Sequence, residues 1–270
     1  MDSRTLQSGG FEPKFENFPI IKFLNSSLTA LCFKLCSGMI SPPERLIVAL
    51  DVSSPAEAQK IVSSLGDSVH IYKVGMQLYT AAGPDIVRGL ISSGRKVFLD
   101  LKFHDIPNTV AAAVREARQL GVSMLTVHAA GGTKMLLAAT EAARETDAKL
   151  QVLAVTVLTS MDEQDLHETG VDLPLAEQVA RLASIALDAG CAGVVSSARE
   201  VKSLRARLGS DFLAVTPGVR PAGSAHGDQA RVTTPAEAIA AGATHIVVGR
   251  PITAAANPAL ELDKILKEIA

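Results

Sequence analysis

Three ionisable residues, Asp100, Lys102 and Asp105, lie within six positions of one another at the end of an apolar run, 96–99. The apolar run predicts a buried strand. Because successive strand side chains alternate between faces, Asp100 and Lys102 are expected on the same side, with Asp105 on the loop that follows. Burying two carboxylates and an ammonium group in an apolar setting costs free energy. The cluster therefore indicates a functional site more readily than a core.

Lys73, which lies at the end of an earlier apolar run, adds a second cation to this cluster. Carboxylates beside Lys102 would keep its amino group protonated and fix its position. A positioned ammonium group can deliver a proton to a carbon atom as negative charge develops there. The carboxylates would also repel a substrate carboxylate placed beside them, which favours its loss. The alternative interpretation is a structural network of ion pairs.

A second group of residues is suited to binding phosphate. Gly249 and Arg250 directly follow the apolar run 245–248. Glycine lets the backbone approach an anion closely, and the guanidinium of Arg250 offers a forked donor to phosphate oxygens. The start of the helix expected after them adds free N–H groups. The alternative is an ordinary turn with a surface arginine.

The segment 216–229 is a long loop that is dense in glycine and proline. A loop of this length in a compact domain is usually functional or without fixed structure. The functional interpretation is a mobile lid that closes over a phosphorylated ligand, with Arg220 or Gln229 reaching the anion. Plain surface disorder is the alternative.

From Glu44 onward, short apolar runs alternate with Ala-rich segments of helical periodicity. The predicted strands are 45–51, 69–74, 96–101, 124–128, 150–156, 193–196, 212–216 and 245–248. The predicted helices include 55–65, 108–120, 132–145, 175–189 and 234–241. Eight such units in roughly 230 residues predict an α/β fold of the (β/α)8 or TIM-barrel type, with a closed parallel sheet of eight strands. An open doubly wound sheet, which usually has fewer strands, is the alternative.

Polar residues, and one glycine, lie at or just beyond the carboxyl ends of most of these strands, where barrel enzymes place their active sites. They are Asp51, Lys73, Asp100, Lys102, His128, Thr159, Thr216, Gly249 and Arg250. The repetition at one end of so many strands favours a barrel with a site at that end. For His128 two interpretations remain, a pocket residue or a hydrogen-bonded core histidine.

The chain has 270 residues, of which 47% are hydrophobic and 4% aromatic, and a formal net charge of −2. This composition suits one large domain of buried parallel strands covered by Ala-rich helices. The small net charge argues against nucleic acid or an acidic membrane as a partner, and no apolar stretch is long enough to span a membrane. Cys32, Cys36 and Cys191 form no metal-ligand constellation, and no set of His, Cys and Glu has metal-ligand spacing. No glycine-rich loop of the Gly-x-Gly-x-x-Gly or Walker type appears either, so neither a metal nor another cofactor is expected. Their number favours a reducing, cytoplasmic location.

Residues 1–42 differ in character from the rest, with Gly9-Gly10, scattered charge and one short apolar patch. They are predicted to form a poorly ordered N-terminal extension that precedes the barrel domain, 43–270. The patch is short and the start is not basic, which argues against a signal peptide. Met39 is an alternative natural start, and a targeting peptide or a partner-docking arm are further alternatives.

These motifs resemble the orotidine 5'-phosphate decarboxylase family in its short bacterial form. The Asp-x-Lys-x-x-Asp element at 100–105 is the mark of the wider superfamily. Further matches make the resemblance specific, at 48–51, 72–75, 158–160, 216–220 and 248–251. The resemblance runs from about Glu44 to about Ala256. It implies a barrel that converts orotidine 5'-phosphate to UMP and CO2 in de novo pyrimidine biosynthesis, without cofactor or metal.

The resemblance also implies a role for each matching residue. Lys102 is similar to the family's proton donor to C6 of the pyrimidine, with Asp100 and Asp105 as its flanking carboxylates. Lys73 is similar to the second lysine of the charged array, which also contacts the substrate. Asp51 matches the family's ribose-binding position, and Thr159 matches a pyrimidine-binding position. The family's phosphate-binding positions are matched by Arg220, Gln229, Gly249 and Arg250.

In this family the second aspartate of the element reaches into the neighbouring subunit's site. The resemblance therefore implies a homodimer in which Asp105, Ile106 and Thr109 act in trans. Two other interpretations remain. One is a sister enzyme that acts on a sugar phosphate through Mg²⁺ and has a metal-binding Glu in place of Lys73, and the other is a barrel that only binds or serves as a scaffold.

Overall fold

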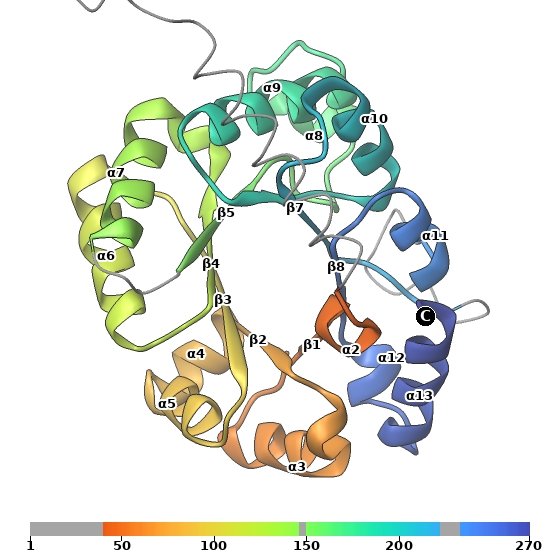
Figure 1. Ribbon diagram of the computed structural model, residues 1–270. Helices are drawn as coiled ribbons and strands as arrows, with labels where there is room; N and C mark the ends of the chain where they lie inside the picture. The colour runs from red at the N-terminus through yellow and green to blue at the C-terminus, as the bar shows by residue number, and fades with distance from the viewer. Residues whose placement is uncertain (1–39, 146–149, 222–232) are drawn as a thin grey trace, which may run out of the picture. The chain divides into compact units, whose positions relative to one another are not determined.

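The computed structural model describes residues 40–145, 150–221 and 233–270. Its strands form a ring, and the helices lie around the outside of that ring (Figure 1). The strands are β1 (Leu46–Ala49), β2 (Ile71–Gly75), β3 (Lys96–Phe103), β4 (Met124–His128), β5 (Gln151–Val155), β6 (Gly193–Val195), β7 (Leu213–Thr216) and β8 (His245–Val248). Each strand pairs in parallel with the next, and β8 pairs with β1, so the sheet closes. The predicted (β/α)8 barrel is confirmed.

Helices connect each strand to the next on the outer face, and further helices precede the first strand and follow the last. They are α2 (Pro42–Arg45), α3 (Pro55–Leu65), α4 (Met76–Ala82), α5 (Asp85–Ser92), α6 (Pro107–Gln119), α7 (Gly132–Arg144), α8 (Glu163–Glu168), α9 (Leu175–Asp188), α10 (Ala198–Leu208), α11 (Pro235–Ala240), α12 (Arg250–Thr253) and α13 (Pro258–Glu268). The predicted helix 55–65 has the bounds of α3, because Ser54 caps its first turn and Pro55 fits the first helical position. The other four predicted helices differ from the observed ones by one residue at one or both ends.

Strand side chains alternate between the barrel interior and the helix layer. The interior is filled by an apolar cluster of Ile47, Ala49, Ile71, Phe98, Met124, Leu153, Leu213, Val215 and Val247. The intervening residues, such as Tyr72 and Leu125, belong to the larger core between strands and helices. The barrel is therefore packed along its axis, and any ligand must bind above this plug of side chains.

The first strand is shorter than the predicted strand 45–51. Arg45 belongs to α2, and Asp51 lies two residues beyond the end of β1. Pairing with β2 continues for one further residue, because the N–H of Leu50 donates to the carbonyl of Lys73 at 3.0 Å. The apolar run in the sequence marks burial, which extends past the regular strand pairing.

The third strand is longer than the predicted strand 96–101, and it is irregular. Its register with β4 shifts between Leu99 and Phe103. Within this stretch Lys102 has a φ of 51°, and among the described residues it is the one non-glycine residue with a positive φ. Such a backbone is strained for lysine and persists where its surroundings hold it. The sequence predicted that regular strand alternation brings Asp100 and Lys102 together. The two side chains do meet, but the reason given was wrong, because Lys102 lies in a bulge and not in a regular strand.

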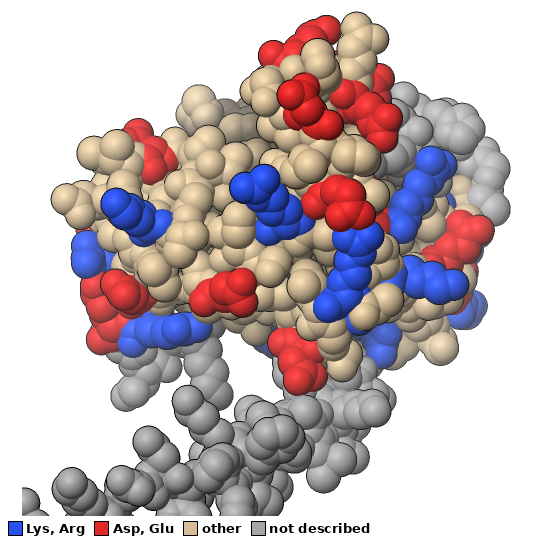
Figure 2. Space-filling view, turned by 90° about the horizontal axis from the view of Figure 1, so that it is seen from above, with Lys and Arg blue, Asp and Glu red and all other residues tan. Residues whose placement is uncertain are grey.

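The outer surface carries charges of both signs. Figure 2 shows Lys and Arg side chains interspersed with Asp and Glu side chains over much of one face, in keeping with the net charge of −2. In the part of the chain that the structure describes, no helix is both long and apolar enough to cross a membrane.

Candidate active site

Charged side chains replace apolar ones at the carboxyl end of the barrel interior. On β2, Ile71 belongs to the interior cluster, and alternation places Lys73 on the same face. On β3, Phe98 is an interior residue and Asp100 is the next residue on that face. Lys73 is only 8% exposed. The two charged residues thus lie directly above the apolar plug.

Asp51, Lys73, Asp100 and Lys102 form a chain of alternating charges. The Nζ atom of Lys73 lies 2.7 Å from Oδ1 of Asp51 and 3.7 Å from Oδ2 of Asp100. The Nζ atom of Lys102 lies 3.0 Å from both carboxylate oxygens of Asp100. Each ammonium group therefore contacts a carboxylate, which offsets the cost of burying an isolated charge. The sequence motif has produced a connected array.

One further polar side chain belongs to the array and was not predicted. Thr126 on β4 is fully buried. Its hydroxyl donates to Oδ1 of Asp100 at 2.9 Å and accepts the backbone N–H of Lys102 at 2.9 Å. The sequence held a signal for it, because alternation along the predicted strand 124–128 puts Thr126 on the same face as Met124. A polar residue at an interior position of a buried strand needs a partner.

Gly75, at the end of β2, leaves room for the ion pair between Asp51 and Lys73. A Cβ atom at this position would lie 3.0 Å from Oδ1 of Asp51 and 3.0 Å from Nζ of Lys73. Carbon atoms in favourable van der Waals contact lie farther apart, at about 3.5–4.0 Å. A larger residue at 75 would therefore displace one partner of the Asp51–Lys73 pair.

A single cavity of about 510 Å³ joins this array to the predicted phosphate-binding residues. Eight residues singled out in the sequence line it: Asp51, Lys73, Asp100, Lys102, Thr159, Arg220, Gly249 and Arg250. Phe98 and Val247 of the apolar plug also line it. A concave site with an apolar base and a few convergent charged groups is typical of small-molecule binding.

The two arginines come from the loops that follow β7 and β8. Arg220 is only 8% exposed, and its backbone N–H donates to the carbonyl of Thr233 at 3.0 Å. Arg250 is exposed and begins α12. Loops in these two positions bind phosphate in many barrels. Gln229, the other phosphate residue predicted on this loop, lies outside the described residues.

Three predicted site residues do not line the cavity of their own chain. Asp105 is exposed, and its Oδ1 atom accepts the N–H of Ile106 at 2.6 Å. Ile106 is 66% exposed, and Thr109 is exposed in the first turn of α6. Within one chain, Lys102 therefore has Asp100 as its carboxylate partner, and the second flanking carboxylate expected from the sequence points elsewhere.

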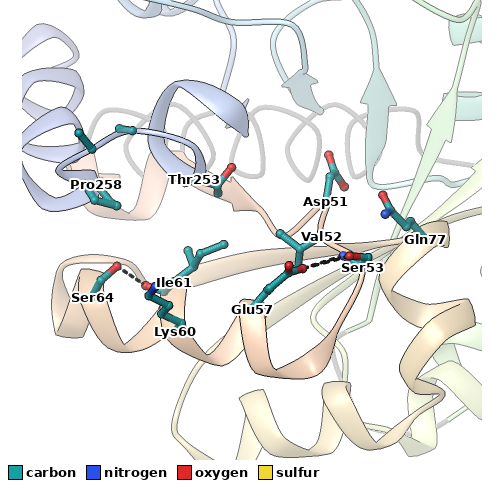
Figure 3. A pocket seen from close by; sticks show the side chains of 12 residues that line it. Asp51, Val52, Ser53, Glu57, Lys60, Ile61, Ser64, Gln77, Thr253 and Pro258 are labelled. Atoms are coloured by element: carbon teal, nitrogen blue, oxygen red, sulfur yellow. Dashed lines mark hydrogen bonds between the residues drawn. The ribbon is translucent and has the colours of Figure 1, made fainter.

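A second cavity, of about 600 Å³, adjoins the first and shares Asp51 and Thr253 with it (Figure 3). The carboxylate of Glu57 faces this cavity but is used locally. It accepts the N–H and the hydroxyl of Ser53 at 3.1 and 3.2 Å, at the start of α3. The charged array and both arginines lie in the first cavity, so we place the active site there.

His128, at the end of β4, does not line the cavity. Its ring stacks on that of His104, with ring centres 5.3 Å apart and planes 22° from parallel. Its Nδ1 atom is buried and has no hydrogen-bond partner. Burial, and next the nearby His104 and Lys102, lower the pKa of His128 from its ordinary value of 6.5. The core interpretation of this histidine is favoured, although the hydrogen bond expected of it is missing at Nδ1.

Polar groups that converge on one cavity at the carboxyl ends of barrel strands are the arrangement by which (β/α)8 enzymes catalyse reactions. Fold and site together define a barrel enzyme whose active-site cavity carries lysine and aspartate. The model of the orotidine 5'-phosphate decarboxylase / HUMPS family matches residues 44–265. The chain belongs to this family.

Individual relatives agree with the family match. An orotidine 5'-phosphate decarboxylase from Moorella thermoacetica is 52% identical over 232 residues, which cover 84% of this chain and 92% of the relative. One from Afipia carboxidovorans is 54% identical over 230 residues, covering 85% of this chain and 96% of the relative. A crystal structure of the enzyme of that name from Lactobacillus acidophilus has a TM-score of 0.74 and 43% identity, and the match covers 83% of this chain and 98% of that one.

Proposed function

We propose that this chain decarboxylates orotidine 5'-phosphate to UMP and CO2, a step of de novo pyrimidine biosynthesis, with Lys102 as the proton donor to C6. The observation that carries the proposal is the shared cavity, in which the array around Lys102 and the arginines after β7 and β8 face one space. A substrate that bears a carboxylate at one end and a phosphate at the other matches these two groups. The names of the relatives support the same substrate.

The array suits the difficulty of the reaction. When the C6–carboxylate bond breaks, CO2 leaves and the electron pair stays on C6, in the plane of the ring, where it cannot delocalise into the π system. The ammonium group of Lys102 stabilises this charge and then transfers a proton to C6, becoming a neutral amine that solvent reprotonates. Preorganised charge of this kind lowers a barrier because it needs no rearrangement during the reaction.

Asp100 and the distant phosphate supply the rest of the barrier reduction. Asp100 holds the ammonium of Lys102 at 3.0 Å and places negative charge close to the substrate carboxylate, which favours its departure. Binding of the phosphate by Arg220, Gln229, Gly249 and Arg250 supplies binding energy remote from the reacting carbon. Asp51 contacts the ribose, Lys73 also binds the substrate, and Thr159 contacts the pyrimidine.

We also propose a homodimer in which Asp105, Ile106 and Thr109 complete the partner's site. The exposure of all three residues at or just before the start of α6 supports this assignment, since the apolar side chain of Ile106, 66% exposed, gains free energy from burial against a partner. The neighbouring chain would then bring the second carboxylate to Lys102. A cytoplasmic location also remains a prediction.

The Mg²⁺-dependent alternative is disfavoured by Lys73. Its ammonium group already lies 2.7 Å from Asp51 and 3.7 Å from Asp100, the carboxylates that a cation in this position would use. Among the residues that the structure describes, no group of three or more His, Cys, Asp and Glu side chains could hold a metal ion. Activity that survives EDTA would separate the two reactions.

The test is a decarboxylation assay with the purified chain, which follows the loss of pyrimidine absorbance and identifies UMP as the product. Enzymatic turnover that is unaffected by EDTA is the expected result. A folded preparation that binds UMP but releases no CO2 from orotidine 5'-phosphate would support the scaffold interpretation and overturn the proposal. A preparation that acts on a sugar phosphate only when Mg²⁺ is present would support the other alternative.

A further inference from the structure

Thr126 is a polar residue in the barrel interior. It follows Met124 on the inward face of β4, and it is fully buried. It lies above the apolar plug at the level of Asp100, because Phe98 pairs with Met124 one step below, and valine would fill nearly the same volume. A buried hydroxyl is retained without a free-energy penalty only when its hydrogen bonds are satisfied. The partners of Thr126 therefore indicate what the hydroxyl does.

Both partners belong to the reacting array. The hydroxyl has one proton to donate, and it donates it to Oδ1 of Asp100 at 2.9 Å. With its lone pairs it accepts the backbone N–H of Lys102 at 2.9 Å. The same carboxylate oxygen of Asp100 lies 3.0 Å from Nζ of Lys102. One side chain on β4 thus fixes the backbone of Lys102 and the carboxylate that its ammonium contacts.

The bulge in β3 explains why this hydroxyl is needed. The register shift between Leu99 and Phe103 interrupts the regular pairing with β4. Lys102 lies inside the interruption with a φ of 51°. A buried N–H group without an acceptor costs free energy, and so does a left-handed lysine backbone. The Thr126 hydroxyl provides the acceptor that the interrupted strand pairing does not, and this holds Lys102 in its strained conformation.

We propose that Thr126 is a positioning residue for the decarboxylation, an inference that rests on the proposed function. Its hydroxyl sets the backbone of Lys102 and the orientation of Asp100, and through them the place of the ammonium group. Thr126 does not line the cavity and takes no proton from the substrate. Its contribution is to the geometry of the charged pair, so it should affect turnover far more than substrate binding.

The substitution Thr126→Val tests the hydroxyl at nearly constant volume. It leaves the N–H of Lys102 without its acceptor and removes one donor from Asp100. We expect kcat to fall roughly 10- to 100-fold, the equivalent of two lost hydrogen bonds, while KM changes little. Thr126→Ser, which keeps the hydroxyl, should restore most of kcat. A structural role limited to packing would give the opposite order, because valine preserves the volume better than serine.

A matched control is available in Thr140 on α7. Thr140 is 2% exposed, and its hydroxyl bonds to the carbonyls of Leu137 and Ala189 at 3.0 and 2.8 Å, away from the cavity. Thr140→Val removes a similarly buried hydroxyl and should leave kcat unchanged. An unchanged kcat in Thr126→Val, a Thr126→Ser variant as slow as Thr126→Val, or an equal loss in Thr140→Val would each overturn the inference.

Crystal structures provide a readout that does not depend on activity. In Thr126→Val we expect Lys102 to leave the left-handed region and its Nζ atom to move away from Asp100. An unmoved Lys102 would contradict the inference even if turnover fell. If the unmodified chain made no UMP, the proposed function would fail. Whether Thr126 holds Lys102 and Asp100 in place would still be decided by comparing the structures of the unmodified chain and of Thr126→Val.

Discussion

The ammonium group of Lys102 lies 3.0 Å from both carboxylate oxygens of Asp100, although only Leu101 separates the two residues in the chain. In a regular strand such a pair would extend side by side from one face. Here Lys102 has a left-handed backbone within a bulge, and its ammonium group contacts both oxygens of the carboxylate. The ammonium group of Lys102, the proposed proton donor, is therefore held in position by Asp100.

Replacement of Lys102 by alanine should abolish turnover without unfolding the chain. The variant loses both the charge that stabilises the C6 anion and the proton that quenches it, so we expect kcat/KM to fall by roughly 10⁴-fold or more. The lysine side chain is 27% exposed, so its removal leaves no large void in the core. Steady-state kinetics and a thermal unfolding curve measure the two effects separately.

Lys96→Ala is the matched control for this prediction. Lys96 begins the same strand at its opposite end and is exposed. Its loss should leave turnover unchanged. Decarboxylation by Lys102→Ala at a rate near that of Lys96→Ala would rule out the proton-donor assignment.

Replacement of Arg250 by alanine should separate phosphate binding from nucleoside binding. The guanidinium is exposed at the cavity beside the loop from β8 and is suited to grip a dianion. We expect the Kd for UMP to rise roughly 10- to 100-fold, as for the loss of hydrogen bonds to a charged group, while the Kd for uridine stays nearly constant. Isothermal titration with both ligands measures this difference.

Arg88→Ala provides the comparison for Arg250→Ala. Arg88 is an exposed arginine on α5 that pairs with Asp85 at 2.8 Å, and it does not line the cavity. Its loss should affect neither ligand. If Arg250→Ala weakened the binding of UMP and of uridine by the same factor, the phosphate role would have to be abandoned.

The sequence predicted the barrel well because its signals are local. Apolar runs at regular spacing mark the strands, and Ser54 with Pro55 marks the start of α3 at the right residue. The cavity could also be anticipated, since the carboxyl ends of parallel strands in a barrel share one face. Asp51, Lys73 and Arg250 meet there although they lie far apart in the chain.

Other features of the site depend on register and could not be read from one strand at a time. The bulge that places Lys102 arises from a mismatch between β3 and β4, and neither segment shows it by itself. Alternation along its own strand places Thr126 on the inward face, but its contact with the bulge depends on the register between β3 and β4 and was therefore missed. Asp105 is close to Lys102 in the sequence, but the loop after β3 directs it to the surface, and it does not line the cavity of its own chain.

Mixing two inactive variants should test whether Asp105 acts in trans. If Lys102 and Asp105 of one site come from different subunits, a heterodimer of Lys102→Ala with Asp105→Ala contains one intact site and one doubly defective site. Purification through both tags isolates the heterodimer, in which one of the two sites is intact, so about half of the unmodified activity is expected. The assay is the rate of UMP formation after the two proteins are co-expressed and purified through different tags.

The control for this mixture is Lys102→Ala with Lys73→Ala. Both lysines line the cavity of their own chain, so every site in that heterodimer carries a defect and the activity should stay at background. Equal recovery in both mixtures would point to an artefact of mixing. No recovery with Asp105→Ala would mean that Asp105 does not complete the partner's site.

A buried histidine at the other end of the barrel should make stability sensitive to acid. His245 begins β8, is 7% exposed, and its Nδ1 atom lies 3.0 Å from the hydroxyl of Thr244. Burial, and then the charges of Arg45 and Lys96, lower its pKa from 6.5 to about 4, against a small opposing effect of Glu44. The folded chain therefore keeps this imidazole neutral at a pH where the unfolded chain protonates it.

The sign of the effect follows from proton binding. Well above pH 6.5 His245 is neutral in both states and contributes no pH dependence. As the pH falls from about 6.5 to about 4, the unfolded state binds a proton that the folded state does not, so the free energy of unfolding decreases, by up to about 3 kcal/mol. The substitution His245→Gln should remove this part of the acid sensitivity. The control His70→Gln, which changes an exposed histidine, should keep it.

Urea unfolding at pH 7 and pH 4.5 measures the free energy of unfolding of each variant at both pH values. An identical pH dependence in His245→Gln and in the unmodified chain would show that His245 is not the group responsible.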